Sequence, residues 1–395
     1  MASIPRLRPY RGPAILSYGF RPFFLLGSLY AALAILAWLP ILHGELSVAT
    51  AFSPRDWHVH EMLFGYVAAV VTGFLLTAIP NWTGRLPIQG MPLLLLIATW
   101  LAGRAAVTLS AWTGWMVAAA VDVAFLVLLA SAAIREIAAG RNWRNLKIVA
   151  MICVLAAANL AFHVEAHVNG VAEYATRAGI GVVVLLITLV GGRIVPSFTH
   201  NWLVRAGGGR LPVPFGGFDV AVVAASVAAL TIWVVQPFGR ATAAALLAAG
   251  LMQTAGLARW AGDRTAREPL VLILHVGYSF VPIGMLLTAA GAIGLVIESA
   301  GVHAWTAGAI GTMTLAVMTR ASLGHTGREL TASAATQVIY SAVVIAALTR
   351  IAAALVPEWN DLLLHITVIA WVVAFLGFGI RYAPILSGGR RALAQ

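Results

Sequence analysis

Twelve apolar segments of membrane length follow one another along this chain. A helix needs roughly 20 residues to cross the hydrocarbon of a bilayer, and it satisfies its own backbone hydrogen bonds there. Of the 395 residues, 61% are hydrophobic and 10% are charged, unlike a soluble domain. We predict an all-α, polytopic integral membrane protein with 12 transmembrane helices near residues 23–42, 60–80, 91–109, 114–134, 146–163, 175–196, 218–235, 241–258, 269–297, 303–320, 333–355 and 362–380.

The basic residues indicate the direction of these helices. With the N-terminus in the cytoplasm, 20 of the 25 Lys and Arg residues fall on the cytoplasmic side, where such residues are enriched. We therefore predict that both termini are cytoplasmic. The loops are too short to fold alone, so residues 1–395 are expected to form a single transmembrane domain. The start is basic and is followed by an apolar run too long for a signal peptide, so we expect no cleaved leader.

Charge and cysteine content exclude several classes of protein. The net charge is +11, but the basic residues are scattered singly between apolar runs, which excludes nucleic acid as a partner and leaves the lipid bilayer. Cys153 is the single cysteine. It excludes an internal disulfide, a cysteine-ligated zinc site, an iron–sulfur cluster and covalently attached haem.

The last third of the sequence resembles the first third. His60 and Gly65 have counterparts 243 residues later, at His303 and Gly308. The middle third matches more weakly. We predict three pseudo-repeated four-helix units, which share one orientation because four is an even number. The alternative is chance similarity between apolar helices. The expected units are residues 15–140, 141–265 and 266–390.

Most of the ten histidines fall near the ends of the expected helices. An imidazole there can hold a metal or a haem iron, or it can be an ordinary interfacial group. His58 and His60 are two residues apart and diverge by about 200° on a helix, so one turn cannot aim both at one ion. His163 and His167 are four apart and share a helix face, the usual spacing for two imidazoles on one metal.

Other polar residues lie within or near the apolar segments. His275 is expected to be either a ligand or a hydrogen-bonded packing residue. Arg104 and Asp122 lie at similar depth on successive helices, which predicts a chiefly structural ion pair. A proton relay through Asp122 is the alternative. Arg193 and Arg320 are candidates for contacts with anions such as haem propionates, or for snorkelling to lipid headgroups.

Four motifs together resemble the NnrS family. They are YGFRPFF at 18–24, WHVHEMLFG at 57–65, PNWTG at 80–84 and MTRASLGHTGR at 318–328. The resemblance implies a twelve-span, multi-pass protein of the bacterial inner membrane that contains non-covalent, b-type haem and copper. It also implies a role in denitrification and in protection from nitric oxide and nitrosative stress.

The cofactors are those that the resemblance implies, and we predict their ligands from the positions of the histidines. For cofactor binding we predict His60, His275, His303, Arg193 and Arg320. As metal ligands we predict His58, His60, His163, His167, His303 and His325. The sequence does not separate haem ligands from copper ligands.

The leading functional hypothesis is a haem- and copper-binding membrane protein that acts on nitric oxide or iron–nitrosyl species. The sequence leaves open whether it is an enzyme, and it indicates no electron donor. Twelve helices in parallel repeats also suit a transporter without redox chemistry. A third alternative is a factor that senses or hands on metal or haem.

Overall fold

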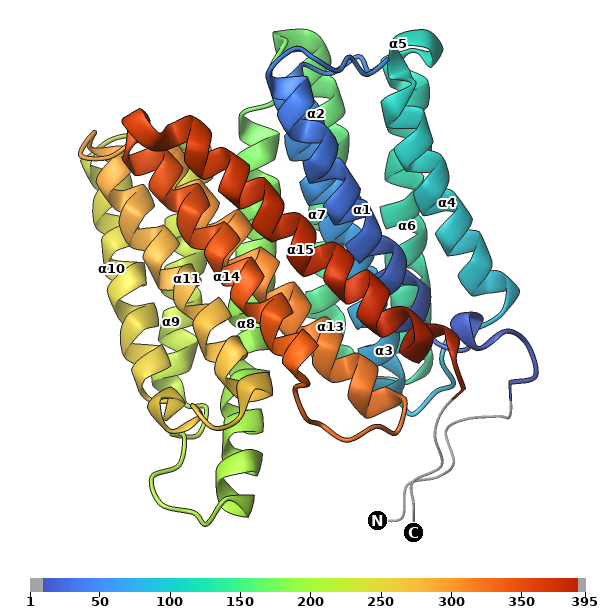
Figure 1. Ribbon diagram of the computed structural model, residues 1–395, viewed down its shortest axis with the longest axis vertical. Helices are drawn as coiled ribbons and strands as arrows, with labels where there is room; N and C mark the ends of the chain where they lie inside the picture. Colours follow the sequence, from blue (N-terminus) through green and yellow to red (C-terminus); the bar gives the residue numbers. More distant parts are fainter. Residues whose placement is uncertain (1–9, 390–395) are drawn as a thin grey trace. The chain divides into compact units, whose positions relative to one another are not determined.

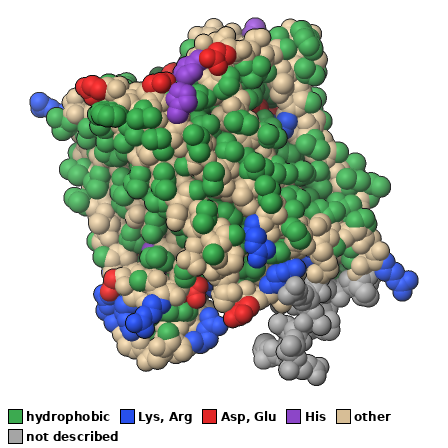
Figure 2. Space-filling model, viewed as in Figure 1, with side chains coloured by type: hydrophobic (Ala, Val, Ile, Leu, Met, Phe, Trp, Pro, Cys, Tyr) green, Lys and Arg blue, Asp and Glu red, His purple; other side chains and the backbone are tan. Residues whose placement is uncertain are grey.

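The computed structural model describes residues 10–389, which contain helices and no strands (Figure 1). Among these residues, eleven helices are long and apolar enough to cross a membrane. The all-α prediction is confirmed, and the apolar helices indicate a membrane protein. Figure 2 shows hydrophobic side chains over the middle of the helices and most charged side chains near their ends. The expected cytoplasmic termini lie outside the described residues.

The candidate spans match eleven of the twelve expected segments. They are Phe20–Leu42, Pro54–Thr83, Met91–Thr108, Trp115–Ala139, Trp143–Asn169, Tyr174–Arg205, Gly217–Val235, Arg240–Ala258, Pro269–Ala292, Ala334–Leu355 and Pro357–Ser387. The helices within them are α1 (Phe20–Leu42), α2 (Pro54–His60), α3 (Ala68–Thr83), α4 (Met91–Thr108), α6 (Trp115–Ala139), α7 (Leu146–Asn169), α8 (Tyr174–Arg205), α9 (Gly217–Val235), α10 (Arg240–Ala258), α11 (Pro269–Ala292), α14 (Ala334–Leu355) and α15 (Asn360–Ser387). A short helix, α5 (Ser110–Thr113), follows α4.

The segment expected to span at 303–320 is helical but is not among the eleven. It consists of α12 (Glu298–His303), the π-helix η5 (Ala304–Ile310) and α13 (Gly311–His325), which follow one another directly. Repeated threonines make it more polar than a typical spanning helix, at positions Thr306, Thr312, Thr314 and Thr319. The twelfth span is therefore not confirmed and stays a prediction.

The chain forms two compact units. The first comprises Met1–Gly179, Ala321–Glu329 and Phe378–Gln395, and the second comprises Ile180–Arg320 and Leu330–Gly377. This division does not coincide with the three four-helix units expected from the sequence, so those units are not confirmed. The single transmembrane domain likewise stays a prediction.

In the first unit, α6 packs against α3, α4 and α7, and α1 packs against α3. Gly103 lets α4 approach α6 closely, because a Cβ there would lie 3.1 Å from Asp122 Cα. Arg21 joins the start of α1 to the end of α15. Its Nη1 donates to the carbonyl oxygens of Leu386 and Gly388 at 2.7 Å each. These carbonyls belong to the end of a helix, where no intrahelical donor is available.

In the second unit, α11 packs against α10, α12 and η5, and α9 packs against α10. A buried polar network crosses three of these helices. Gln253 Nε2 donates to Ser226 Oγ at 2.9 Å, and Tyr278 Oη donates to Gln253 Oε1 at 2.9 Å. Because each of these bonds pairs a buried donor with a buried acceptor, the network contributes to a defined packing of α9, α10 and α11.

Two π-helices follow the histidines that match in the sequence. η2 (Glu61–Val67) begins directly after His60, and η5 begins directly after His303. Each contains seven residues. π-Helical segments are rare in proteins, and those that occur often lie at functional sites. In η2 the carbonyl oxygen of Gly65 accepts a hydrogen bond from Trp100 Nε1 at 3.0 Å, so a backbone group in the π-turn has a partner on α4.

Candidate metal centre

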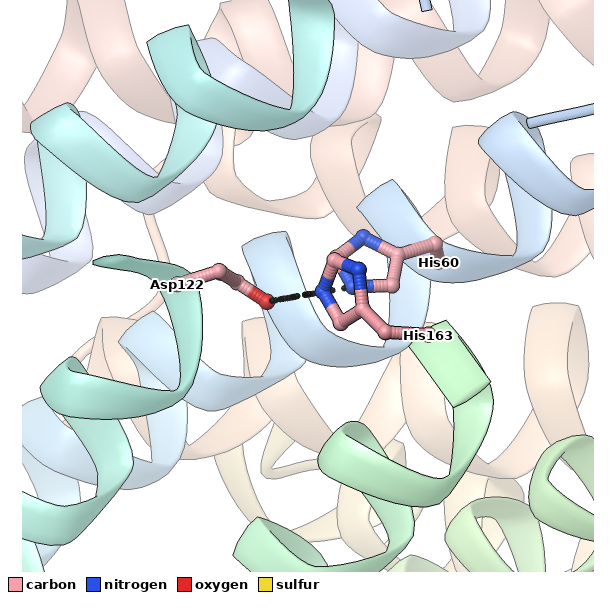
Figure 3. Close-up of side chains that lie close together, drawn as sticks. All are labelled: His60, Asp122 and His163. Carbon is pink, nitrogen blue, oxygen red and sulfur yellow. Dashed lines mark hydrogen bonds and ion pairs between the residues drawn. The ribbon is translucent and has the colours of Figure 1, made fainter. Parts of the chain in front are cut away.

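Three helices of the first unit bring two histidines and one aspartate together (Figure 3). His60 ends α2, Asp122 lies in α6 and His163 lies in α7. His60 Nε2 is 3.1 Å and His163 Nε2 is 3.2 Å from Asp122 Oδ2. One possible ligand atom from each residue lies within 4.8 Å of the others, and all three residues are buried. This set is called the His60–Asp122–His163 cluster.

A buried ion-pair network holds the cluster on its α4 side. Arg104 Nη1 lies 2.8 Å from both Oε1 and Oε2 of Glu61. Arg104 Nη2 donates to Asp122 Oδ1. The ion pair between Arg104 and Asp122 expected from the sequence is thus confirmed. The guanidinium group also binds Glu61, because a single nitrogen, Nη1, contacts both oxygens of that carboxylate, and hydrogen bonds between charged groups are the stronger ones.

His60, Asn159 and Tyr30 complete the network. His60 Nδ1 is 3.0 Å from Glu61 Oε1, and His60 Nε2 is 3.0 Å from Asn159 Oδ1. Asn159 Nδ2 donates to Asp122 Oδ2 at 2.8 Å. Tyr30 Oη donates to Glu61 Oε2. Neither Asn159 nor Tyr30 was expected from the sequence. Asn159 stands four residues before His163 on α7, so its place on the same helix face was the available signal.

Two glycines make room for these charged groups. A Cβ at Gly65 would lie 2.7 Å from Arg104 Nη1 and 3.2 Å from Glu61 Oε2. A Cβ at Gly103 would lie 2.9 Å from Asp122 Oδ1. A larger residue at either position would displace a charged atom of the network.

Aromatic rings surround the two histidines. The ring centroids of Phe52, Phe162 and Phe64 lie 5.0, 5.2 and 5.3 Å from that of His60. Phe52 is also 5.1 Å from His163. These rings shield the two imidazoles from water. Electrostatic interactions of the histidines are therefore stronger than they would be in solvent.

The comparisons with known proteins identify the family. The family model described as "NnrS protein" matches residues 14–390. The chain belongs to the NnrS family. A comparison with curated proteins gave no significant match. The NnrS family is associated with metals and haem, and the buried cluster of this family member is a site that could bind a metal ion.

The cluster of this NnrS family member fits a single ion and does not fit a haem. A haem ligand must present a ring nitrogen to a flat macrocycle. Both ring nitrogens of His60 instead face polar side chains, and phenyl rings pack beside the imidazole. A small ion needs only the space between the three ligand atoms.

The other metal-ligand candidates of the first unit lie outside the cluster. The His58 ring stacks on Trp38 at a centroid distance of 4.4 Å. His167 is exposed, and its ring stacks on Trp115 at 4.5 Å. His58 and His60 therefore diverge, as expected. His163 and His167 were expected to share one metal, but in this structure their rings contact different partners because His167 is drawn to Trp115.

The ring of His325, at the end of α13, also contacts aromatic side chains of the first unit. Its centroid lies 5.8 Å from that of Tyr18 and 5.6 Å from that of Phe20. These contacts place His325 beside the start of α1, in the first of the four motifs quoted from the sequence.

The remaining candidates belong to the second unit. His275 Nε2 is 2.8 Å from Thr199 Oγ1, and His303 Nδ1 donates to the carbonyl oxygen of Ser299 at 2.6 Å. The guanidinium of Arg320 lies 4.0 Å from the ring centroid of Phe198. The guanidinium of Arg193 lies 5.8 Å from that of Phe215. Their roles as cofactor-binding residues stay predictions.

Proposed function

We propose that this NnrS family member binds a transition-metal ion at His60, Asp122 and His163 and acts in nitric oxide metabolism or in protection from nitrosative stress. One observation carries the proposal. Three helices place two imidazole nitrogens and one carboxylate oxygen within 4.8 Å of one another, away from solvent. Copper is the metal implied by the family resemblance, and imidazole nitrogen is among its usual ligands.

Each residue of the network has a definite task in this proposal. His60, His163 and Asp122 supply the ligand atoms. Glu61 accepts a hydrogen bond from His60 Nδ1 at 3.0 Å, which leaves Nε2 as the ring atom directed at the cluster, as the second hydrogen bond of a ligating histidine does. Arg104 orients the Asp122 carboxylate.

A bound copper ion would supply a place for nitric oxide to bind and for an electron to enter. Three protein ligands leave a further coordination position for a small molecule. The protein's own contribution is a buried, apolar surrounding, because Phe52, Phe64 and Phe162 pack against the imidazoles. Nitric oxide is small and uncharged, so an apolar surrounding does not oppose its entry.

We assign the haem implied by the family to the second unit rather than to His60. Both ring nitrogens of His275 are closely packed. Nε2 contacts Thr199, and a Cβ at Gly262 would lie 2.5 Å from Nδ1. His303 is the better candidate, because the hydrogen bond from Nδ1 to Ser299 is of the kind made by ligating histidines. Arg193 and Arg320 remain the candidates for propionate contacts.

Metal analysis of the purified full-length protein tests the copper proposal. We expect His60→Ala and His163→Ala to lose copper while the iron content is kept. His167→Ala is the matched control, since it removes a histidine one turn further along α7 and should keep both metals. Full copper retention in both cluster variants would refute the assignment. A colourless wild-type protein without copper or iron would favour a transporter instead.

Two further measurements test the rest of the proposal. Consumption of nitric oxide by reduced, metal-loaded protein would establish an enzyme, whereas binding without consumption would favour a sensor or a handling factor. The bacterial inner membrane and the cytoplasmic termini are also proposed here. A reporter fused after Gln395 that is active only in the cytoplasm tests the orientation.

A further inference from the structure

Apart from its two histidines, the buried network around the cluster contains more carboxylates than guanidinium groups. Its ion pairs join two carboxylates, Glu61 and Asp122, to one guanidinium, Arg104. The exposed fractions of these side chains are 0%, 2% and 6%. A histidine that ligates a metal is neutral, so with both histidines in their ligating form the network, without the ion itself, carries a net charge of −1. An uncompensated charge in such a place is costly.

The charge of the bound ion therefore matters. An ion of charge +1 brings the network to neutrality, whereas a divalent ion leaves it at +1. A divalent ion would restore neutrality only with an added anion, and the apolar rings of Phe52, Phe64 and Phe162 beside the imidazoles would not stabilise the charge of that anion.

We propose that the His60–Asp122–His163 cluster selects a monovalent ion, such as cuprous copper, over divalent ions. This inference rests on the proposed function, since it presumes that the cluster binds a metal. Coulomb's law gives the expected size of this selectivity. One unit charge about 6 Å away, at an effective dielectric constant of about 20, changes an affinity roughly 100-fold.

The ligand atoms by themselves favour the opposite selectivity. The cluster offers no sulfur, and two imidazoles with a carboxylate are an ordinary set for divalent zinc or copper. A preference for a monovalent ion must then come from the surrounding charges. Arg104 separates the effect of charge from that of the ligand atoms, because it supplies no ligand atom to the cluster but contributes to the net charge of the network.

The test compares silver(I), a monovalent ion that does not change its oxidation state, with zinc(II). Every protein in this comparison, including the one called wild type, carries Cys153→Ser, because the exposed thiol of Cys153 would itself bind silver(I). Full-length protein stripped of metal is titrated with each nitrate salt in competition with a chromophoric chelator. We expect wild-type protein to bind silver(I) more tightly than zinc(II). Arg104→Met changes the net charge of the network to −2. The electrostatic binding free energy of zinc(II) then improves by twice as much as that of silver(I), so the silver-to-zinc affinity ratio falls roughly 100-fold. Arg104→Lys keeps the charge and should keep the ratio within about threefold.

Glu61→Gln provides an independent test should Arg104→Met fail to fold. It removes one negative charge, which weakens zinc(II) more than silver(I) and raises the ratio. Tighter binding of zinc(II) by wild-type protein, or a ratio that does not move in these variants, overturns the charge-based selectivity. Absence of binding of either ion to wild-type protein refutes the metal site itself, so the two failures are distinguishable.

Discussion

Arg104 Nη1 lies 2.8 Å from each carboxylate oxygen of Glu61, and both side chains are buried. Glu61 is the first residue of the π-helix η2, so the contact fixes an irregular piece of backbone to a regular helix, α4. The same guanidinium reaches Asp122 on α6. One side chain thereby links three parts of the first unit and positions a carboxylate of the cluster.

Glu61→Ala should lower the free energy of unfolding by about 3–5 kcal/mol, because it leaves a buried guanidinium with one partner fewer. Denaturant titration of the detergent-solubilised protein measures this loss. The surface pair of Arg210 and Asp263 is the matched control, since these side chains are 59% and 67% exposed. Asp263→Ala should cost less than about 1 kcal/mol. Equal losses in the two variants would contradict a structural role for the buried pair.

Gly65→Ala should destabilise the protein by about 1–3 kcal/mol, because the added methyl group meets Arg104 Nη1. It should also lower copper content, since the displaced guanidinium holds Asp122. Gly217→Ala is the control, because a Cβ there meets no atom within 4 Å. The measurements are thermal unfolding and metal content. A fully stable, copper-replete Gly65→Ala protein would show that the close contact is relieved without cost.

Asn159→Leu should lower copper affinity by about 10- to 100-fold while all three ligand residues remain. Asn159 Nδ2 donates to Asp122 Oδ2 at 2.8 Å, and Asn159 Oδ1 lies 3.0 Å from His60 Nε2, so its loss removes a hydrogen bond that orients the Asp122 carboxylate and a polar neighbour of His60. Chelator competition measures the affinity. Leu160→Ala, at an exposed position of the same helix, should bind copper like the wild type. Unchanged affinity in Asn159→Leu would mean that packing alone orients the ligands.

Arg21→Ala should release the end of α15, because its guanidinium is a partner of the carbonyl groups of Leu386 and Gly388. We expect faster amide hydrogen exchange in residues 380–389, observed by mass spectrometry, with little change in α6. Arg381→Ala removes an exposed arginine from α15 itself and should leave exchange unaltered. Identical exchange in Arg21→Ala and wild type would show that other contacts suffice to hold this helix end.

The helices and part of the candidate site could be predicted from the sequence. Apolar runs of membrane length predicted the eleven helices that are long and apolar enough to cross a membrane, because such a run must satisfy its own backbone hydrogen bonds as a helix. The sequence predicted the pairing of Arg104 and Asp122, because charged side chains within a membrane are costly and opposite charges at similar depth on successive helices tend to pair. The divergence of His58 and His60 followed from helix geometry alone.

Other parts of the site leave little trace in the sequence. Asn159 and Tyr30 are uncharged residues in apolar runs, so nothing about them demanded a partner. His163 and His167 share a helix face by spacing, but an aromatic neighbour from α6, Trp115, decides where the His167 ring lies. A π-helix has no hydrophobic period of its own over seven residues, so η2 and η5 could not be read from the pattern.

The π-helix after His60 has a consequence for how the cluster is controlled. An α-helix advances 100° per residue because it has 3.6 residues per turn, and a π-turn accommodates one residue more. If η2 changed to regular α-helix, the residues before it would rotate by about 100° relative to α3, and His60 would turn out of the cluster. The hydrogen bond from Trp100 to Gly65 and the contact between Arg104 and Glu61 oppose that rotation. The helical phase of η2 and the geometry of the three candidate ligands are thus coupled: a change in the winding of this segment would also move His60 relative to Asp122 and His163.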